Sequence, residues 1–394
     1  DVSIELTPEV ATERLRRRTD HVVEMMAESA IVNLRRHRVE VLHAEASLGP
    51  DRSVVVRPLD GSAPQTLTAP VIIIATGSRP FHPPGIPFDD VDVLDSDAAA
   101  ALDHPLKSLV VVGGGAVGCE FASIFTALGA DVTLVDSGAR LLPYMDAEIA
   151  ELLASTFRNV GMRVVQDAGR ATAARTPSGL RVELASGEAL TPEKVIFATG
   201  RVGNTEALEL DAAGVATDDR GRVIVDEHYR TTAKGVYAAG DVIGPPALAS
   251  VSMEQARIAA CWAFDLPLKR TADQLPPYGV YSVPEVAMVG LTEAAAAAES
   301  IDYAVGRAPF AYNTRAAISG AVEGMVKLVF ERPTLRLLGV HVLGDAATEL
   351  VHLGQAVIAF GGTIEFFVNS TFNVPTMSEA YKYAAYDGLS QASA

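Results

Sequence analysis

Three glycines, Gly113, Gly115 and Gly118, follow an apolar run and precede a helical pattern in the stretch VVVGGGAVGCE. At this spacing the first glycine permits a tight turn, the second lets a pyrophosphate approach the backbone, and the third lets a helix pack closely on a strand. The N-terminus of the following helix offers free N–H groups and a positive dipole end to phosphates. The pattern therefore predicts a dinucleotide-binding loop within a βαβ region that runs from Leu109 to about Gly200.

A carboxylate at the end of the second predicted strand bears on which coenzyme this loop would bind. Asp136 lies where an acid accepts hydrogen bonds from the 2′-hydroxyl of an adenosine ribose. The same charge repels a 2′-phosphate, which favours NAD(H) over NADP(H). The nearby Ser137 and Arg140 are candidates for accommodating such a phosphate, and the sequence leaves the two alternatives open.

A second carboxylate, Asp241, closes the apolar stretch TTAKGVYAAGDV at residues 231–242. The pattern places Gly240 and Asp241 at the C-terminal end of a strand, where ligands bind in doubly wound sheets. A carboxylate there can accept hydrogen bonds from the hydroxyls of a sugar or a ribityl chain. The segments VIIIATGSRP (71–80) and VIFATGRVGN (195–204) nearly repeat each other, which indicates two similarly built nucleotide-binding domains.

The order of these motifs, namely ATG, GxGxxGxE, ATGR and TxxxxVYAAGD, resembles that of the pyridine nucleotide–disulfide oxidoreductases, flavoproteins with two dinucleotide-binding domains. The resemblance covers essentially the whole chain. It implies an α/β fold with two Rossmann-like domains, for FAD and NAD, and a C-terminal α+β dimerisation domain through which the chain forms a homodimer. The implied FAD-binding domain comprises residues 1–105 and 228–276, the NAD(P)-binding domain residues 106–227, and the dimerisation domain residues 277–394.

The resemblance also implies roles for individual residues. Asp241 would contact the ribityl chain of FAD, and Glu120 would be a catalytic residue near the nicotinamide, with local helix packing as the alternative. Met253–Ala256 would begin a helix that faces the flavin ring. For Arg201, a contact with a NAD phosphate and a cap on a loop remain equal alternatives. The candidate cofactor-binding residues are Thr76, Gly77, Gly113, Gly115, Gly118, Asp136, Gly200, Arg201, Gly240, Asp241, Met253, Glu254, Gln255 and Ala256.

Two family features are absent from the printed sequence. It contains no second GxGxxG for the pyrophosphate of FAD and no redox CxxxxC, and Asp1 falls where the family is already inside its long helix. We therefore expect a fragment that lacks the first strand, the FAD phosphate loop and the redox segment. Such a chain should hold FAD weakly or not at all.

The C-terminal stretch FNVPTMSEAY bears on the reaction. Disulfide reductases of the family carry a histidine in a HPTxSE pattern, and here Pro375, Thr376 and Glu379 match while Val374 takes the place of the histidine. Because valine cannot move a proton, dithiol chemistry such as that of dihydrolipoamide dehydrogenase is not expected. Glu379 is then expected to be a structural hydrogen-bond partner at the dimer interface.

The segment 352–385 resembles the C-terminus of the soluble, Si-specific pyridine nucleotide transhydrogenases, a subfamily that lacks this histidine. The resemblance implies FAD-mediated hydride transfer between NADPH and NAD⁺, with FAD, NAD and NADP as cofactors. Two alternatives stay open: an NAD(P)H:quinone or other acceptor reductase, and a truncated, non-catalytic dimer that binds NAD.

The composition excludes several other classes. A net charge of −17 argues against nucleic acid or an anionic membrane surface. The basic run at 14–18 is expected to be the solvated face of an amphipathic helix. No apolar run reaches the ~18 residues of a membrane span. Cys119 and Cys261 lie in no CxxC or CxxxxC motif, which suits a reducing cytoplasm. His341 and His352 are spaced poorly for a metal site, and none is predicted.

Overall fold

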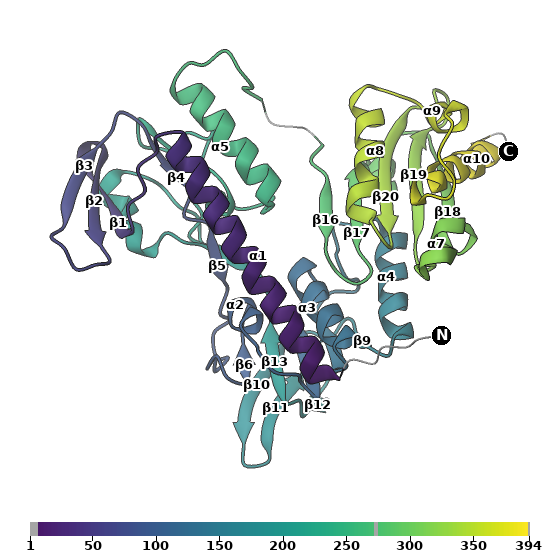
Figure 1. Ribbon diagram of the computed structural model, residues 1–394, viewed down its shortest axis with the longest axis horizontal. Helices are drawn as coiled ribbons and strands as arrows, with labels where there is room; N and C mark the ends of the chain where they lie inside the picture. Colours follow the sequence, from purple (N-terminus) through teal and green to yellow (C-terminus); the bar gives the residue numbers. More distant parts are fainter. Residues whose placement is uncertain (1–6, 272–274, 393–394) are drawn as a thin grey trace. The chain divides into compact units, whose positions relative to one another are not determined.

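The computed structural model describes residues 7–271 and 275–392, which form two compact units (Figure 1). The first unit comprises Asp1–Thr12, His82–Thr199 and Leu275–Ala394, and the second comprises Glu13–Phe81 and Gly200–Gln274. Each unit is discontinuous in sequence, as expected when one nucleotide-binding domain interrupts another. No helix in the described part of the chain is long and apolar enough to cross a membrane.

The first unit contains a five-stranded parallel sheet in the order β6-β13-β7-β8-β9. β7 lies in the middle of the sheet, and its residues 109–112 are all buried, as expected for a parallel strand covered on both faces. This arrangement confirms the predicted Rossmann-like fold of this part of the chain. The elements are β6 (Val93–Leu94), α2 (Ser96–Ala100), β7 (Ser108–Val112), α3 (Ala116–Ala127), β8 (Asp131–Val135), α4 (Ala147–Asn159), β9 (Arg163–Val165) and β13 (Lys194–Phe197).

A three-stranded antiparallel sheet lies in the chain between β9 and β13. Its strands β10 (Ala171–Thr176), β11 (Gly179–Leu184) and β12 (Ala189–Leu190) follow one another in sequence and in space. β11 alternates buried and exposed residues, so one face of this sheet packs against the core and the other faces solvent.

The C-terminal part of the first unit is an α+β domain, as predicted. Its antiparallel sheet has the order β16-β17-β20-β19-β18, with α8 and α10 beside it (Figure 1). The elements are β16 (Tyr278–Val280), β17 (Val286–Gly290), α6 (Glu293–Ala298), β18 (Tyr303–Pro309), η5 (Phe310–Tyr312), α7 (Thr314–Ser319), β19 (Met325–Glu331), β20 (Leu337–Leu343), α8 (Ala347–Ala359), α9 (Glu365–Asn369), η6 (Met377–Glu379) and α10 (Ala380–Ala392).

The second unit is built from three small sheets and one long helix. β4 pairs in parallel with β15, β5 pairs antiparallel with β14, and β1-β2-β3 form an antiparallel meander. The elements are β1 (Ala44–Gly49), η1 (Pro50–Arg52), β2 (Ser53–Pro58), β3 (Gln65–Thr68), β4 (Ile72–Ile74), β5 (Ser78–Pro80), β14 (Arg201–Gly203), η2 (Glu206–Leu208), η3 (Leu210–Ala213), β15 (Val236–Ala238), η4 (Asp241–Ile243) and α5 (Ala249–Ala263).

The N-terminal helix α1 (Pro8–Arg36) forms where the sequence predicts a long helix. Its basic run at 14–18 is mostly exposed, as expected for a solvated face. Its apolar residues differ from expectation, because Met26 and Leu34 are exposed as well, at 67% and 36%. Thr12 is the buried residue of this helix.

The two compact units do not coincide with the predicted domains, whose boundaries stay a prediction. Residues 82–105 belong to the first unit, because β6 pairs with β13 of the NAD sheet. Residues 200–227 belong to the second unit, where β14 pairs with β5. The predicted boundaries at 105 and 227 were drawn from the motifs. The chain instead changes unit after Phe81, just beyond β5, and after Thr199, just before β14.

One buried ammonium group joins the two parts of the first unit. Lys327 on β19 is fully buried, and its Nζ lies 2.6 Å from Asp146 Oδ1 and 2.8 Å from Glu148 Oε2, and also contacts Glu293. Asp146 caps the N-terminus of α4 by accepting from the N–H of Glu148. Arg307 on β18 donates to Glu148 at 2.7 Å. The cluster therefore fixes α4 of the NAD domain against the C-terminal sheet.

The charges in this cluster depend on one another. Burial raises the pKa of Asp146, but the hydrogen bond and the charge of Lys327 outweigh burial and hold that pKa below its ordinary value. Glu148 behaves in the same way, with Arg307 and Lys327 as its partners. Burial alone would lower the pKa of Lys327, and its three carboxylate partners raise it instead.

Replacing Lys327 by methionine should therefore destabilise the protein strongly. Lys327→Met removes the cation from the buried carboxylate of Asp146 and from the partly exposed carboxylates of Glu148 and Glu293. Breaking a buried ion pair in this way costs about 3–5 kcal/mol. Chemical denaturation measures this loss. Arg332→Met is a matched control, because Arg332 pairs with Asp302 at the surface, where such pairs contribute about 0–1 kcal/mol. Equal losses in the two variants would contradict the assignment.

The same cluster predicts a pH dependence. The folded-state pKa values of Asp146 and Glu148 lie below their ordinary values of 3.8 and 4.5. Their contribution is thus complete above about pH 5 and is lost as the pH falls through the folded values. In Lys327→Met, burial raises these pKa values, so acidification from pH 6 to 4 should stabilise the variant relative to wild type. Parallel pH profiles of the unfolding free energy would contradict this prediction.

Candidate functional site

The glycine loop after β7 has the geometry that the sequence predicts. Gly113 has φ +118°, and a Cβ there would lie 2.4 Å from the Ala198 carbonyl oxygen. A Cβ on Gly118 would lie 1.7 Å from the carbonyl oxygen of Gly113, so α3 packs directly on the loop. Gly115 caps the N-terminus of α3, and a Cβ there would meet no atom within 4 Å. The open space beside Gly115 is where a phosphate can approach the backbone.

Asp136 follows β8, the strand beside β7, and its carboxylate closes the loop. Oδ1 accepts from the N–H of Gly114 at 2.8 Å, and Oδ2 accepts from the N–H of Gly138 at 3.1 Å. Each oxygen keeps a second lone pair, which a ribose hydroxyl can use. The neighbouring Arg140 donates to the Pro143 carbonyl at 3.1 Å, and its buried Nε has no hydrogen-bond partner within the described residues.

Glu120 begins the second turn of α3 and is half-buried. Its Oε1 accepts from the N–H of Tyr281 at 2.9 Å, and Ser123 on the same helix accepts from the N–H of Val283 at 3.0 Å. Burial raises the pKa of Glu120, and the bond from Tyr281 opposes that shift in part. Cys119 beside it is fully buried, and burial raises the pKa of its thiol, as expected for a small packed residue.

The second unit brings Asp241 to the C-terminal end of β15, beside the turn that follows β4. Asp241 Oδ2 accepts from Ser78 Oγ at 2.9 Å. Thr76, in the same turn, donates through its hydroxyl to the Asn204 carbonyl at 2.7 Å, and Asn204 N–H donates to the Gly77 carbonyl at 3.0 Å. The ATG turn is therefore tied to the start of the β14 region, and Asp241 lies at the edge where ligands bind.

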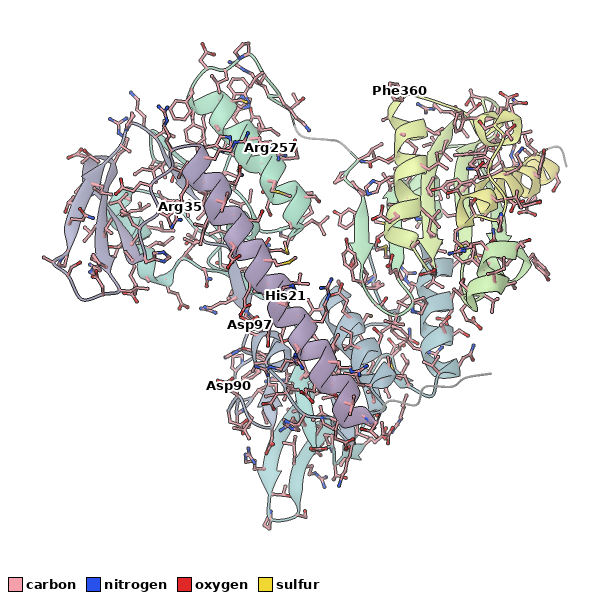
Figure 2. All side chains as sticks on the ribbon, in the orientation of Figure 1. His21, Arg35, Asp90, Asp97, Arg257 and Phe360 are labelled. Carbon is pink, nitrogen blue, oxygen red and sulfur yellow. The ribbon has the colours of Figure 1, made fainter. Side chains whose placement is uncertain are left out.

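The other predicted residues of the second unit take different positions. Met253 is 54% exposed in the first turns of α5, whereas Gln255 is buried and accepts from the N–H of Gly240 at 2.8 Å. Glu254 pairs with Lys269 at 2.7 Å and with Arg257, which is labelled in Figure 2. Ala256 is half-buried on the same helix.

Arg201 and Gly200 lie at the start of β14. Gly200 has φ +116°, and its carbonyl accepts from the N–H of Phe81. Arg201 donates from Nε to Ser78 Oγ and from Nη2 to the Ser78 carbonyl, both at 2.7 Å. The guanidinium therefore has partners within its own chain, which fits the alternative of a cap on a loop. The contact with a NAD phosphate stays a prediction.

In the C-terminal segment, position 374, where the disulfide reductases of the family carry a histidine, is a valine and cannot carry a proton. Val374 is 63% exposed, and Glu379 accepts from the hydroxyl of Tyr383 in the same chain at 3.2 Å. His341 is buried in β20 against the Leu291 carbonyl, and His352 bonds to Gln355, so both imidazoles have structural partners. Phe360, labelled in Figure 2, is 91% exposed at the end of α8.

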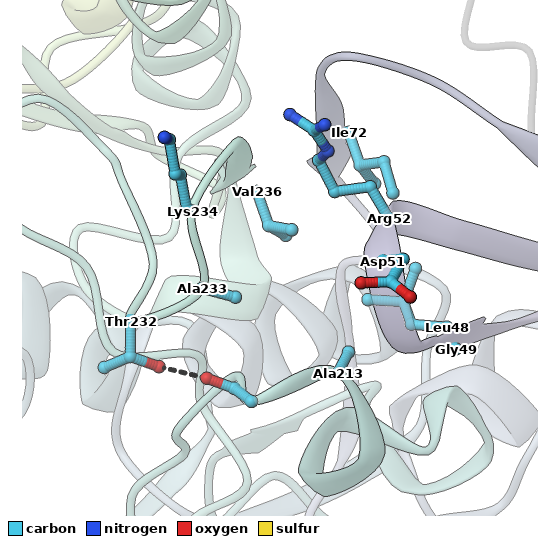
Figure 3. A pocket seen from close by; sticks show the side chains of 11 residues that line it. Leu48, Gly49, Asp51, Arg52, Ile72, Ala213, Thr232, Ala233, Lys234 and Val236 are labelled. Atoms are coloured by element: carbon cyan, nitrogen blue, oxygen red, sulfur yellow. Dashed lines mark hydrogen bonds between the residues drawn. The ribbon is translucent and has the colours of Figure 1, made fainter.

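A cavity of about 420 Å³ in the second unit lies away from Asp241 (Figure 3). Ile72 and Val236, which line it, begin β4 and β15, whereas Asp241 follows the end of β15. Thr232 at its rim donates to the Gly214 carbonyl at 2.7 Å, shown as the dashed line. The cavity is therefore at the N-terminal edge of these strands, opposite to the edge that binds ligands in such sheets.

Within residues 7–271 and 275–392, one group of side chains has the spacing of metal ligands: Asp146, Glu148 and Glu293. The Lys327 ammonium lies among these carboxylates and takes the place that a cation would occupy. The arrangement is an ion-pair cluster rather than a metal site.

The sequence analysis missed two sets of partners, namely Ser78 with Asp241 and Lys327 with its three carboxylates. Ser78 directly follows the ATG turn. Its position next to a strand end of the kind that binds ligands could have marked it as a candidate site residue. The role of Lys327 had no such signal, because its partners Asp146, Glu148 and Glu293 all lie far from it in sequence.

Two glycine substitutions should separate folding from nucleotide binding. Gly118→Ala places a methyl group on the Gly113 carbonyl and should cost about 1–3 kcal/mol of stability. Gly115→Ala meets no atom and should cost at most about 1 kcal/mol. It should nevertheless weaken NADH binding about tenfold or more, because the methyl group occupies the approach to the backbone. Thermal unfolding and NADH fluorescence titration measure the two effects, and wild-type affinity in Gly115→Ala would contradict the placement.

The family of the chain follows from comparison with known proteins. The model of the pyridine nucleotide-disulphide oxidoreductases matches residues 4–256, and the dimerisation domain of the same family matches residues 276–385. The soluble pyridine nucleotide transhydrogenase of Pseudomonas syringae pv. tomato is 42% identical over 90% of this chain and 77% of its own length. That of Mycobacterium bovis is 41% identical over 95% of this chain and 80% of its own length.

Solved structures agree with this relationship. The HOCl-induced flavoprotein disulfide reductase RclA from Escherichia coli superposes with a TM-score of 0.88 at 26% identity, over 96% of this chain and 88% of its own. LpdA from Mycobacterium tuberculosis gives a TM-score of 0.86 at 28% identity, over 97% of this chain and 84% of its own. The glycine loop, the strand-end carboxylates and these matches together establish that the chain belongs to the pyridine nucleotide-disulphide oxidoreductase family.

Proposed function

We propose that the protein transfers a hydride between NADPH and NAD⁺ through FAD, as a soluble pyridine nucleotide transhydrogenase. The observation that carries the proposal is the C-terminal segment, where Val374 stands and Glu379 is bonded to Tyr383 of its own chain. Dithiol reduction needs a proton carrier at this place, whereas hydride transfer between two nucleotides needs positioning and a flavin. The relatives named above carry the same activity in their names.

The first unit fits the nicotinamide nucleotides. The N-terminus of α3 and the open backbone at Gly115 suit a pyrophosphate, and Asp136 suits an adenosine ribose. Glu120 follows this loop by a single helical turn, and its bond from Tyr281 fixes the carboxylate. We place Glu120 beside the nicotinamide on this basis.

A transhydrogenase must accept both NADP(H) and NAD(H), although Asp136 favours NAD(H). Two contacts soften this preference. The carboxylate accepts from the N–H groups of Gly114 and Gly138, which offset part of its charge. Arg140, four residues along the chain, adds a positive charge close to this carboxylate in sequence. These groups support binding of a 2′-phosphate with lower affinity than a free ribose.

The second unit fits the ribityl side of FAD. Asp241 offers a carboxylate at the strand end, and Met253 lies exposed in the first turns of α5. The printed sequence contains no second GxGxxG for the FAD pyrophosphate. When bound, FAD supplies a hydride acceptor and donor between the two nucleotides. The residues of this unit then hold the flavin rather than react.

The dimerisation domain supports a homodimer. Exposed apolar side chains on its surface include Val374, Tyr383 and Tyr386, at 63%, 53% and 47%. We propose that a second copy covers this surface, and that the enzyme works in the cytoplasm, where its two thiols stay reduced.

Steady-state reduction of thio-NAD⁺ by NADPH tests the proposed reaction, using protein supplied with FAD. We expect turnover that depends on FAD and needs no lipoamide. Parallel assays with dihydrolipoamide plus NAD⁺, and with NADH plus a quinone, identify the alternatives. Turnover with the quinone but not with thio-NAD⁺ would contradict transhydrogenation and favour an acceptor reductase. Absence of flavin binding would favour the non-catalytic reading.

A further inference from the structure

Asp241 uses its two carboxylate oxygens unequally. Oδ2 accepts from Ser78 Oγ at 2.9 Å, whereas Oδ1 accepts no hydrogen bond from the described residues. A carboxylate held by one oxygen cannot rotate freely, and its other oxygen keeps a fixed direction. The strand end thus presents one free acceptor.

Ser78 is itself held in place by Arg201. The guanidinium donates from Nε to Ser78 Oγ and from Nη2 to the Ser78 carbonyl, both at 2.7 Å. Because the lone pair of Oγ receives the Arg201 N–H, the hydroxyl hydrogen of Ser78 is directed to Asp241. Hydrogen bonds arranged in such a chain polarise and strengthen one another. The ladder between β5 and β14 also fixes the backbone of Ser78, which pairs with Gly203.

Gln255 holds the same turn from the other side. Its side chain is 5% exposed, and its Oε1 accepts from the N–H of Gly240 at 2.8 Å. Gly240 adopts φ +83° and ψ −162°, a conformation that residues with a Cβ rarely reach. A hydrogen bond at this glycine peptide helps to fix the direction in which Asp241 leaves the strand.

We propose that Ser78 and Gln255 are positioning residues that hold the Gly240–Asp241 turn, so that Oδ1 of Asp241 stays available to the hydroxyls of the ribityl chain. The inference rests on the proposed function, because it assigns FAD to this edge. It gives Gln255 and Arg201 a role through Asp241 rather than through contact with a cofactor.

A flavin titration of the intact chain tests the role of Ser78. Ser78→Ala should weaken FAD binding about tenfold, which corresponds to about 1.4 kcal/mol, and Ser78→Thr, which keeps the hydroxyl, should restore most of the affinity. Ser252→Ala is the matched control, since Ser252 lies beside Gly240 but donates to the Leu248 carbonyl. Equal losses in Ser252→Ala and Ser78→Ala would overturn the inference.

A double-mutant cycle asks whether Ser78 acts through Asp241. In an Asp241→Ala background, Ser78→Ala should change the FAD dissociation constant less than about twofold, because the acceptor it positions is gone. If Ser78→Ala costs tenfold in both backgrounds, the hydroxyl acts on the flavin by another route. That result would overturn the positioning role while leaving FAD binding intact.

Amide hydrogen exchange tests the turn without flavin. Gln255→Met removes the acceptor at similar size, so the Gly240 N–H should exchange faster while the exchange of β7 in the first unit stays unchanged. Unchanged exchange at Gly240 would overturn the role of Gln255. Faster exchange in a chain whose wild type binds no FAD would uphold the held turn and contradict the proposed function instead.

Discussion

The approach of α3 to the loop after β7 is the contact on which the nucleotide site depends. The backbone of Gly118 packs so closely on the Gly113 carbonyl that no side chain fits between them. This contact places the N-terminus of α3 at the C-terminal edge of the sheet, where free N–H groups of the first turn are suited to a phosphate. It also fixes Glu120, one turn along, against the N–H of Tyr281. The same close contact therefore packs the helix on the loop and positions the groups that we propose bind the nucleotide.

The two units hold their strand-end carboxylates, Asp136 and Asp241, in different ways. In the first unit, both oxygens of Asp136 accept backbone N–H groups of the surrounding loops. In the second unit, a side chain holds one oxygen of Asp241, and Gln255 holds the preceding peptide. Asp136 therefore shapes its own loop, whereas Asp241 is oriented by residues from β5 and α5. Both arrangements leave lone pairs on the carboxylate oxygens that can accept hydrogen bonds from hydroxyl groups.

The parts of the site that follow from local spacing were predictable from the sequence. Gly113, Gly115 and Gly118 occupy the predicted positions because backbone geometry leaves few residues able to form this turn. The Lys327 cluster was not predictable, since Lys327 on β19, Glu293 on α6 and the two carboxylates at the start of α4 meet only after the C-terminal sheet packs on α4. Ser78 and Asp241 are likewise far apart in sequence. The exposed apolar residues of α1, such as Met26, show that periodicity predicts a helix but not what covers it.

The central claim is that one flavin exchanges hydride with both nucleotides. Rapid mixing of the FAD-loaded protein with NADPH, followed by NAD⁺, tests it through the flavin absorbance near 450 nm. NADPH should bleach this band, and NAD⁺ should then restore it without oxygen or a disulfide substrate. A band that NADH bleaches but NADPH does not, or that NAD⁺ fails to restore after NADPH, would contradict the account.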